Sequence, residues 1–354
     1  MFVSPSAGDA GEETEERAGR GEGSQARPLQ RYRKGNDEFM KAITAAGYGG
    51  VDMLRVEEVA APRARRGEVL VEVHACSVNP IDWKLRRGDF KILTGFRPPK
   101  IPGSDFAGIV AEVGPGVTDY DTGDPVWGFV DRQSRGTYAE FVVVEGEELA
   151  PKPQNLNFEE AASLPLAGLT AYQGLLHTGN LRAGQHILVN GASGGVGSIA
   201  VQIGKAMGCK VTGVCGPDHV DLVLEMGADR VLDYTREDPL ATGEEYDLFF
   251  DVVANQSFAR TRHVLRTGGV YVRTLPSFES LVLAPILNPF RAQKGKAMDC
   301  RASSADLEAL GTLVKEGKLR PQIEKVYPLE EAATAHTRSE GGHVAGKLVL
   351  RVKE

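Results

Sequence analysis

A glycine-rich turn is the first stretch of this sequence whose residue types could do chemistry. Residues 192–197 read ASGGVG, after an apolar segment typical of a buried strand and before a segment with helical periodicity. In that context Gly194 would let the backbone approach a pyrophosphate, Gly197 would let the helix pack on the strand, and the N–H groups of the helix N-terminus would favour an anion. A tight turn without a ligand is the alternative, and the flanking strand and helix favour a dinucleotide site.

The end of the next strand bears on which dinucleotide the turn would hold. NAD sites usually carry Asp or Glu about 20 residues after the glycines, where the carboxylate accepts a hydrogen bond from the ribose 2′-hydroxyl. Here the strand ends at Cys215 and continues into Gly216, which leaves room for the 2′-phosphate of NADPH. Asp218 would repel such a phosphate, and no Arg or Lys follows directly, so NADH remains an alternative. The nearest side chains that could donate to a phosphate are His219, Tyr234 and Arg236.

These residues lie in a series in which strands and helices alternate. Buried-strand patterns cover 186–190, 210–215, 230–234, 246–254 and 268–275, and helical patterns cover 194–208 and 218–228. The strands are apolar enough to be covered on both faces, which is typical of a doubly wound parallel sheet. In the helix that follows the turn, one face would carry the apolar residues Val196, Ile199, Ile203 and Met207.

A β-rich block precedes this series. Alternating or apolar strand patterns occupy 41–45, 68–79, 105–114 and 139–146, with Gly or Pro at nearly every boundary, which predicts a small, partly closed barrel. A helical segment then begins near residue 158, where Asn157 is a suitable N-cap before two Glu residues in the first turn. At the other end of the chain, 304–319 is helical, and a final strand at 346–352 most simply returns to the first block.

Length and composition limit the class of protein. A chain of 354 residues is long enough for two domains, and 42% hydrophobic with 25% charged residues is typical of a globular protein. With a formal net charge of −7, the chain lacks the broad basic surface that nucleic acid or an anionic membrane would need. The apolar stretch 281–290 is too short to span a bilayer. We therefore expect small-molecule partners, no nucleic acid and no membrane span.

Cysteine usage and the N-terminal residues add two expectations. The four cysteines, Cys76, Cys209, Cys215 and Cys300, form no C-x-x-C pair, which argues against a disulfide framework and a thiolate metal cage and fits a reducing, cytoplasmic compartment. Residues 1–39 are rich in Gly, Glu, Arg and Ser and nearly empty of large apolar residues, so we expect a disordered extension. Because Met40 opens a sequence typical of a natural start, a vector-derived or mis-started extension is as consistent with this composition as a functional tail.

Seven segments, in order and at family spacing, carry a resemblance to a known family. They are ACSVNPIDWKLRRG from residue 75, IPGSDFAGIVAEVGPGV from 101, GDPVWG from 123, AASLPLAGLTAYQGL from 161, GASGGVG from 191, GADRVLDY from 227 and GGHVAGKLVL from 341. On these residues the chain from Met40 onward resembles the zinc-independent quinone oxidoreductases, the zeta-crystallin-like branch of the medium-chain dehydrogenase/reductase superfamily. Within that branch it resembles the chloroplast-envelope quinone oxidoreductase homologues of plants and related enone reductases.

The resemblance implies an α/β fold with two domains and an active site in the cleft between them. A GroES-like, β-rich substrate domain would cover residues 40–164, a Rossmann domain with a doubly wound parallel sheet would cover 165–300, and 301–354 would return to the first domain. It also implies NADPH-dependent hydride transfer to a small-molecule carbonyl or quinone, including enones and reactive aldehydes. Relatives of this kind are often homodimers.

Within the motifs, the resemblance assigns Lys84 and Asn79 to the substrate. Since negative charge develops on the substrate oxygen as hydride arrives, hydrogen-bond donors must stabilise it, and Lys84 is the candidate electrophile and proton relay. The alternatives are a solvated lysine and a turn-forming asparagine before Pro80, while Asp82 is more typical of internal hydrogen bonding. The residues assigned to the cofactor are Thr170, Ser193, Gly194, Gly195, Val196, Gly197, Cys215, Gly216, His219, Tyr234, His343 and Val344.

Two other functions remain open at this point. Zinc alcohol dehydrogenases of the same superfamily carry a cysteine ligand where this chain has Asn79, and Gly-His-Glu where it has Gly103, Ser104 and Asp105, so we expect no metal. A non-catalytic NADPH-binding or interaction protein is the second alternative, because the loop after Cys215 departs from the family pattern. That alternative predicts cofactor binding without turnover.

Overall fold

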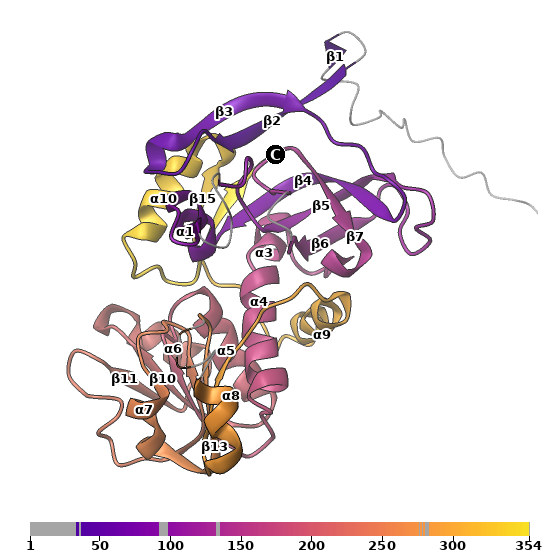
Figure 1. The fold of residues 1–354 in the computed structure, drawn as a ribbon. Helices are drawn as coiled ribbons and strands as arrows, with labels where there is room; N and C mark the ends of the chain where they lie inside the picture. The colour runs from indigo at the N-terminus through magenta and orange to yellow at the C-terminus, as the bar shows by residue number, and fades with distance from the viewer. Residues whose placement is uncertain are drawn as a thin grey trace, which may run out of the picture.

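Two lobes joined by a helix make up the part of the chain that the computed structural model describes, residues 33–34, 37–91, 98–131, 135–275, 277, 279 and 283–353. The lobes lie one above the other in Figure 1, and helix α4, Pro165–Tyr172, runs between them. Most of the predicted N-terminal extension lies outside the described residues. Strand β2 begins at Asp37, three residues before the predicted start of the first domain.

The lower lobe in Figure 1 is built on a six-stranded sheet in which every pairing is parallel. Its strands are β9 (His186–Asn190), β10 (Lys210–Cys215), β11 (Arg230–Asp233), β12 (Tyr246–Asp251), β13 (Leu265–Arg273) and β14 (Lys294–Ala297). They lie in the order β11-β10-β9-β12-β13-β14, so the chain runs outward from β9 to β11 and then returns to the other side of β9. This is the order of a Rossmann domain, and it predicts a ligand crevice between β9 and β12 at the carboxyl ends of the strands.

Apolar residues explain why these strands lie inside the lobe. Every residue of β9 is buried, as expected of a strand covered on both faces. The helices of this lobe are α5 (Gly195–Ala206), α6 (Val220–Glu225), α7 (Phe258–Thr261) and α8 (Ala284–Leu287). In α5, Ile199 and Ile203 are each 1% exposed, whereas Met207 follows the last helical residue and is 36% exposed. The predicted apolar face of α5 therefore ends at Ile203, and its extension to Met207 is wrong.

The upper lobe contains a seven-stranded sheet around β4 (Glu68–Val78). The other strands are β5 (Asp105–Val113), β6 (Pro125–Phe129), β7 (Phe141–Glu145), β8 (Leu149–Pro151), β15 (Ile323–Pro328) and β16 (Lys347–Arg351). Their order is β15-β16-β4-β5-β6-β8, with β7 also paired to β4. Strand β16 pairs antiparallel with β4, with Leu348 opposite Val78, which confirms that the C-terminal strand returns to the β-rich block.

A three-stranded sheet and several helices complete the described part of the chain. Strands β1 (Arg33–Lys34), β2 (Asp37–Ala45) and β3 (Leu54–Ala60) form the sheet, and the helices are α1 (Pro80–Arg87), α3 (Phe158–Ala162), α9 (Ser304–Lys315) and α10 (Ala332–Glu340). The side chain of Asn157 accepts a hydrogen bond from the backbone N–H of Glu160 at 2.8 Å, which confirms the predicted N-cap of α3. All four cysteines are unpaired. Within the described ranges, no helix is both long enough and apolar enough to cross a membrane.

Candidate active site

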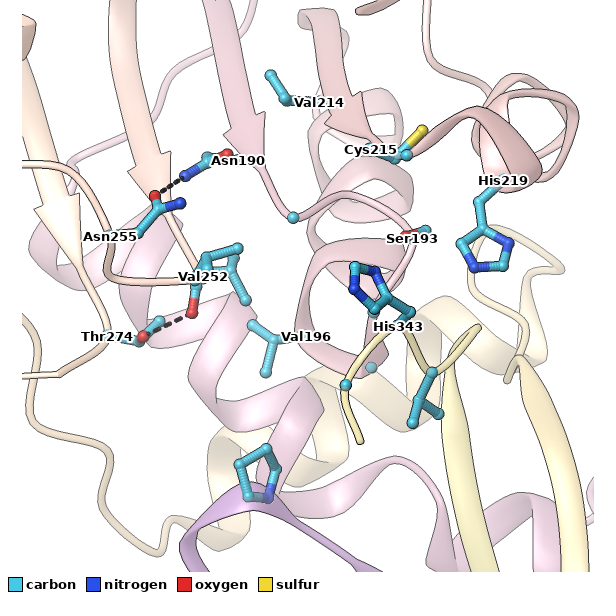
Figure 2. Close-up of a pocket in the computed structure, with 18 of the residues that line it drawn as sticks. Asn190, Ser193, Val196, Val214, Cys215, His219, Val252, Asn255, Thr274 and His343 are labelled. Carbon is cyan, nitrogen blue, oxygen red and sulfur yellow. Dashed lines mark hydrogen bonds between the residues drawn. The ribbon is translucent and has the colours of Figure 1, made fainter. Parts of the chain in front are cut away.

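A cavity of about 1020 Å³ opens at the carboxyl ends of β9, β10 and β12, where the strand order reverses. Such a crevice is where open α/β sheets bind ligands. Figure 2 shows this cavity, which we call the larger cavity, between the turn before α5 and His343. His343 lies on the loop before β16. All the residues predicted to bind the cofactor line it except Thr170 and Gly197.

The glycine-rich turn forms one wall of the larger cavity. Gly194 is the N-cap of α5, and a Cβ placed on it would meet no atom closer than 3.7 Å, so its cavity side is open. A Cβ on Gly197 would instead lie 2.0 Å from the carbonyl oxygen of Gly191, so the helix can pack on the turn only with a glycine there. An open glycine at the positive end of a helix fits the pyrophosphate of a nicotinamide dinucleotide.

Two neighbouring strands end in polar side chains that we did not single out from the sequence. Asn190, the last residue of β9, donates from Nδ2 to Asp251 Oδ1 at 2.7 Å and to Asn255 Oδ1 at 2.9 Å. Asp251 is 0% exposed, and its carboxylate also accepts two backbone N–H groups from the loop after β12. Figure 2 shows Asn190 and Asn255 meeting beside the cavity. In the sequence, the Asn that ends the otherwise apolar run of β9 is the feature that could have indicated these polar side chains.

The end of β10 contributes the residues predicted to surround a ribose. Cys215 is 2% exposed, and burial raises the pKa of its thiol to about 11, so the thiol is neutral. The hydroxyl of Tyr234 lies 3.2 Å from the place where a Cβ of Gly216 would be, which puts this ring against the turn. Asp218, expected to repel a 2′-phosphate, is exposed and does not line the cavity, whereas the exposed Arg236 does.

A smaller cavity of about 420 Å³ adjoins the larger one. Its walls are mostly apolar and include Phe129 and Leu166. Polar contributions come from Ser104 and Thr170 and from the ionisable residues Asp82, Arg86, Asp131, Arg135 and Asp299. Thr170, predicted beside the cofactor, thus lines the smaller cavity instead of the larger one. The residues that border both cavities are Asn79, Pro80, Ile81, Ala167, Val196, Thr274 and Leu275. A small molecule in one cavity would meet a ligand in the other at this shared wall.

The two residues predicted to contact the substrate lie at the start of α1. Lys84 lines the larger cavity; burial lowers the pKa of its half-buried amine, which lies 5.5 Å from the centre of the Trp83 ring. Asn79 is 4% exposed and belongs to the shared wall. It precedes the first residue of α1, where its backbone N–H donates to Asp82 Oδ2 at 2.7 Å. Its side chain turns away from the helix toward Asp105.

A buried group of polar atoms holds the side chain of Asn79. Its Nδ2 donates to Asp105 Oδ2 at 2.8 Å, and its Oδ1 accepts a hydrogen bond from Lys347 Nζ at 2.5 Å. Lys347 is 6% exposed; its amine also donates to the carbonyl of Val78 at 3.2 Å and lies 3.5 Å from Asp105 Oδ2. Neither the lysine nor the aspartate was singled out for this role from the sequence, because their spacing along the chain gives no local signal.

The same atoms decide whether a zinc ion fits. Zinc takes thiolate, imidazole or carboxylate ligands in tetrahedral arrangement. Asp105 already accepts hydrogen bonds from Ser77 Oγ at 2.5 Å and from the Leu166 N–H at 2.6 Å, besides its contacts with Asn79 and Lys347. The amine of Lys347 itself places a cation beside this carboxylate. An amide, a hydroxyl and a carboxylate that is already paired do not fit a zinc ion.

A second buried carboxylate lies next to the first. Burial raises the pKa of Asp82 to about 7, and its Oδ2 accepts a hydrogen bond from the Tyr138 hydroxyl at 3.1 Å. The same hydroxyl lies 3.2 Å from His336 Nε2, and burial, assisted by Arg86, lowers the pKa of His336 to about 3. Asp82 therefore takes part in internal hydrogen bonding, as the sequence indicated.

The loop between α10 and β16 lines the larger cavity with His343 and Val344. Glu324 anchors this loop in two ways. Its carboxylate forms a two-bond ion pair with Arg338 at 2.7 and 2.9 Å, and it accepts the backbone N–H of Ala345 at 2.8 Å. Glu324 thus holds in place the loop whose residues His343 and Val344 are predicted to contact the cofactor.

Two family models match the chain. Residues 65–154 match the alcohol dehydrogenase GroES-like domain, and residues 226–350 match the zinc-binding dehydrogenase family. The first match covers β4 to β8 of the upper lobe. The second begins in the six-stranded sheet and continues through the C-terminal return to the upper lobe.

Individual relatives match over most of their length. A chloroplastic quinone-oxidoreductase homolog of Spinacia oleracea is 32% identical over 324 residues, which cover 88% of this chain and 98% of the relative. A chloroplastic NADPH-dependent alkenal/one oxidoreductase of Arabidopsis thaliana is 34% identical and is covered to 79%, over 88% of this chain. Among solved structures, the quinone oxidoreductase from Coxiella burnetii is 32% identical with a TM-score of 0.81, over 89% of this chain and 100% of that one.

Proposed function

Because the chain belongs to the quinone oxidoreductase branch of the medium-chain dehydrogenase/reductase superfamily, we propose that it is an NADPH-dependent, zinc-independent reductase of quinones or α,β-unsaturated carbonyl compounds. The observation that carries this proposal is the wall shared by the two cavities. The larger cavity has the volume and the glycine-rich turn that a dinucleotide needs. The smaller cavity is mostly apolar, which suits an enone, a reactive aldehyde or a quinone.

The larger cavity would hold a nicotinamide cofactor, which supplies the hydride when bound. The turn from Ser193 to Gly197 and the first N–H groups of α5 would bind its pyrophosphate. His343 and Val344 would contact it from the loop before β16. On the shared wall, Val196 and Thr274 would lie beside its reactive end.

The ribose end supports NADPH in preference to NADH. The neutral thiol of Cys215 stands where NAD enzymes usually place a carboxylate. Arg236 lines this part of the cavity, and Asp218 does not. NADH stays an alternative, because Glu237 and Asp238 also line the cavity and would weaken the attraction for a phosphate.

The chain's own residues would hold the substrate oxygen and supply a proton. As hydride reaches the β-carbon of an enone, negative charge moves to the oxygen, and a donor placed there lowers the barrier. Asn79 borders both cavities and would be that donor. Lys84 would approach from the larger cavity as an electrophile and as the acid that protonates the reduced product, since its lowered pKa makes its ammonium a better acid than that of a solvated lysine.

The test follows the oxidation of NADPH and of NADH by absorbance with a panel of enones, reactive aldehydes and quinones. We expect saturable oxidation with at least one of these acceptors and a higher kcat/KM with NADPH than with NADH. Binding of NADPH without turnover on any acceptor would instead identify a non-catalytic binding protein. Stoichiometric, tightly bound zinc would identify an alcohol dehydrogenase.

Two further features of the proposal concern assembly and compartment. Apolar side chains in α8 and on either side of it are solvent-exposed, with Leu283 at 40%, Ile286 at 62% and Phe290 at 87%, and a homodimer would cover such a surface. Sedimentation of the purified protein measures this directly. A cytoplasmic location stays a prediction, because the names of several relatives place those proteins in chloroplasts or mitochondria.

A further inference from the structure

The amine of Lys347 is a buried charge to which the proposed reaction gives no role. Three acceptors surround it: the carbonyl of Val78, Asn79 Oδ1 and Asp105 Oδ2. A protonated lysine has three N–H donors and no acceptor, so each N–H has a partner. Burial lowers the pKa of Lys347, and the nearby carboxylates of Asp105 and Asp82 oppose that shift. Since a buried charge is costly unless it is paired, the amine and Asp105 stand as an ion pair.

These two charged neighbours dictate how the amide of Asn79 is oriented. An ammonium can only donate a hydrogen bond, and a carboxylate can only accept one. Oδ1 of Asn79 must therefore face Lys347, and Nδ2 must face Asp105. The two hydrogen bonds have lengths of 2.5 and 2.8 Å, respectively. Asp105 takes one of the two hydrogens on Nδ2. For the other, the described residues offer no acceptor, and Asn79 borders both cavities, so this N–H is left for an oxygen at the shared wall.

The same lysine is also in contact with the glycine-rich turn. A Cβ on Gly195 would lie 2.6 Å from Cδ of Lys347, so the aliphatic part of the lysine packs directly on the turn. One residue earlier, the N–H of Gly346 donates to the carbonyl of Ser193 at 2.8 Å. The start of β16 thus connects the turn in the lower lobe with Asn79 in the upper lobe.

We propose that Lys347 is a positioning residue that orients the free N–H of Asn79 and sets its place relative to the glycine-rich turn. It acts through Asn79, because its amine already donates to Val78 and Asn79 and lies in an ion pair with Asp105. The competing explanation is an ion pair that only stabilises the return of β16 to the sheet. The inference rests on the proposed function, since the donor role of Asn79 belongs to that proposal.

Nuclear magnetic resonance of ¹⁵N-asparagine-labelled protein tests the orientation without any reaction. The side-chain NH₂ signals of Asn79 are assigned by their loss in Asn79→Ala. We expect one NH₂ pair in which the proton bound to Asp105 exchanges with water at least about 10-fold more slowly than that of an exposed asparagine. In Lys347→Met this pair should split or broaden, because either amide orientation is then allowed. An unchanged pair would overturn the proposal.

Kinetics with the best acceptor separates positioning from mere stabilisation. Lys347→Met should lower kcat by roughly 10- to 100-fold, the scale for a misplaced donor, while the Kd of NADPH changes by less than about threefold. Adding Lys347→Met to Asn79→Ala should cost less than about threefold more, because Asn79→Ala alone already costs about 10²-fold and removes the group through which Lys347 acts. If the two losses multiply, Lys347 is only structural. Lys353→Met is the matched control, because Lys353 lies two residues after β16 and forms an exposed ion pair with Glu72.

Two provisions keep the outcome decisive. If Lys347→Met fails to fold because Asp105 is left buried and unpaired, the double variant Lys347→Met/Asp105→Asn removes both charges, and its comparison with Asp105→Asn alone isolates the lysine in both experiments. If the wild-type protein turns over no acceptor, the proposed function fails, and the NMR comparison still decides whether Lys347 orients Asn79. The two failures are therefore distinguishable.

Discussion

Burial sets the chemical state of two ionisable side chains that line the larger cavity. It raises the pKa of the Cys215 thiol to about 11, so this side chain offers neither charge nor nucleophile to a ribose. It lowers the pKa of the Lys84 amine, whose ammonium is thereby a stronger acid than in water. Burial thus leaves the Cys215 thiol uncharged, and it makes the ammonium of Lys84 a better proton donor.

Replacing Lys84 by Ala should lower kcat/KM by about 10²-fold, the usual scale for a positioned acid or donor. If the ammonium is the active form, the wild-type rate falls as pH rises through the pKa of Lys84, which lies below its ordinary 10.5. That alkaline decline should be absent in the variant, and steady-state pH profiles measure both. Arg87→Ala is the control, because Arg87 also lies over the Trp83 ring but does not line the cavity. Full activity of Lys84→Ala would show that the electrophile assignment is wrong.

Arg236 should decide part of the preference between the two cofactors. Hydrogen bonds to charged groups are worth about 1.5–3 kcal/mol, and solvent screening of an 81% exposed guanidinium reduces this to a factor of roughly 5 to 10 in Kd. Arg236→Ala should weaken NADPH binding by that factor and NADH binding by less than about twofold. Arg230→Ala is the control for fluorescence titrations, because Arg230, like Arg236, is ion-paired with a carboxylate but lies outside the cavity wall. Equal weakening of both cofactors would place the 2′-phosphate elsewhere.

The element that brings these residues together is the β9–turn–α5 unit. Two of its glycines have different neighbours: the cavity beside Gly194, and the carbonyl of Gly191 beside Gly197. Turn, helix and strand can pack only if the second position has no side chain, whereas the first position tolerates one until a ligand must fit. The same unit therefore contains one position that serves binding and another that serves folding.

Replacing Gly194 or Gly197 by alanine should separate the effect on binding from the effect on folding. Gly194→Ala should leave the melting temperature within about 2 °C, because its backbone is extended and its Cβ meets open space, but should weaken cofactor binding at least about 10-fold. Gly197→Ala forces a Cβ to within 2.0 Å of backbone and should lower the melting temperature by several degrees even without cofactor. Thermal unfolding and NADPH titration measure both. A Gly194→Ala protein that binds NADPH normally would remove the pyrophosphate from this turn.

The clearest local signals in the sequence came from strands buried on both faces. The apolar runs of β9, β10 and β12 and the glycines of the turn gave local signals, and the relatives and the strand order confirm the fold that they indicated. Strands β14 and β15 were not predicted, because their residues, KGKA and IEKVYP, lack a buried-strand pattern. The partner of Asn79 was missed for another reason. Lys347 is 268 positions away, and no local pattern records a contact of that range.

At the scale of the whole molecule, an element that leaves the upper lobe and the last strand of that lobe meet at the site. Helix α4 begins beside the buried Asp105, which accepts the N–H of Leu166. Strand β16 returns to β4 and brings Lys347 to the same carboxylate (Figure 1 shows the upper lobe that receives this return). Both contacts with Asp105 therefore help to fix the distance between the turn and Asn79, and stability and alignment of the site depend on the same buried charges.

A second buried set, Asp82, Tyr138 and His336, couples protonation to folding. In the unfolded chain between about pH 4 and 6.5, Asp82 is ionised and His336 is protonated. In the folded protein, burial raises the pKa of Asp82 to about 7 and lowers that of His336 to about 3, so the proton resides on Asp82. Both states bind one proton on this pair. The pair therefore leaves the free energy of unfolding almost independent of pH in this range.

Single substitutions should expose two opposite slopes that cancel in the wild-type protein. In His336→Gln the folded state binds one proton more on Asp82, so stability relative to wild type should fall as pH rises from 4.5 to 6 by up to about 1.4 kcal/mol per unit. In Asp82→Asn the unfolded state binds the extra proton on His336, so stability should rise with pH by a similar amount. Urea unfolding at several pH values measures these slopes, with the exposed His343→Gln as control. Slopes of equal sign would refute the proton exchange, because only opposite shifts of the two pKa values make the signs differ.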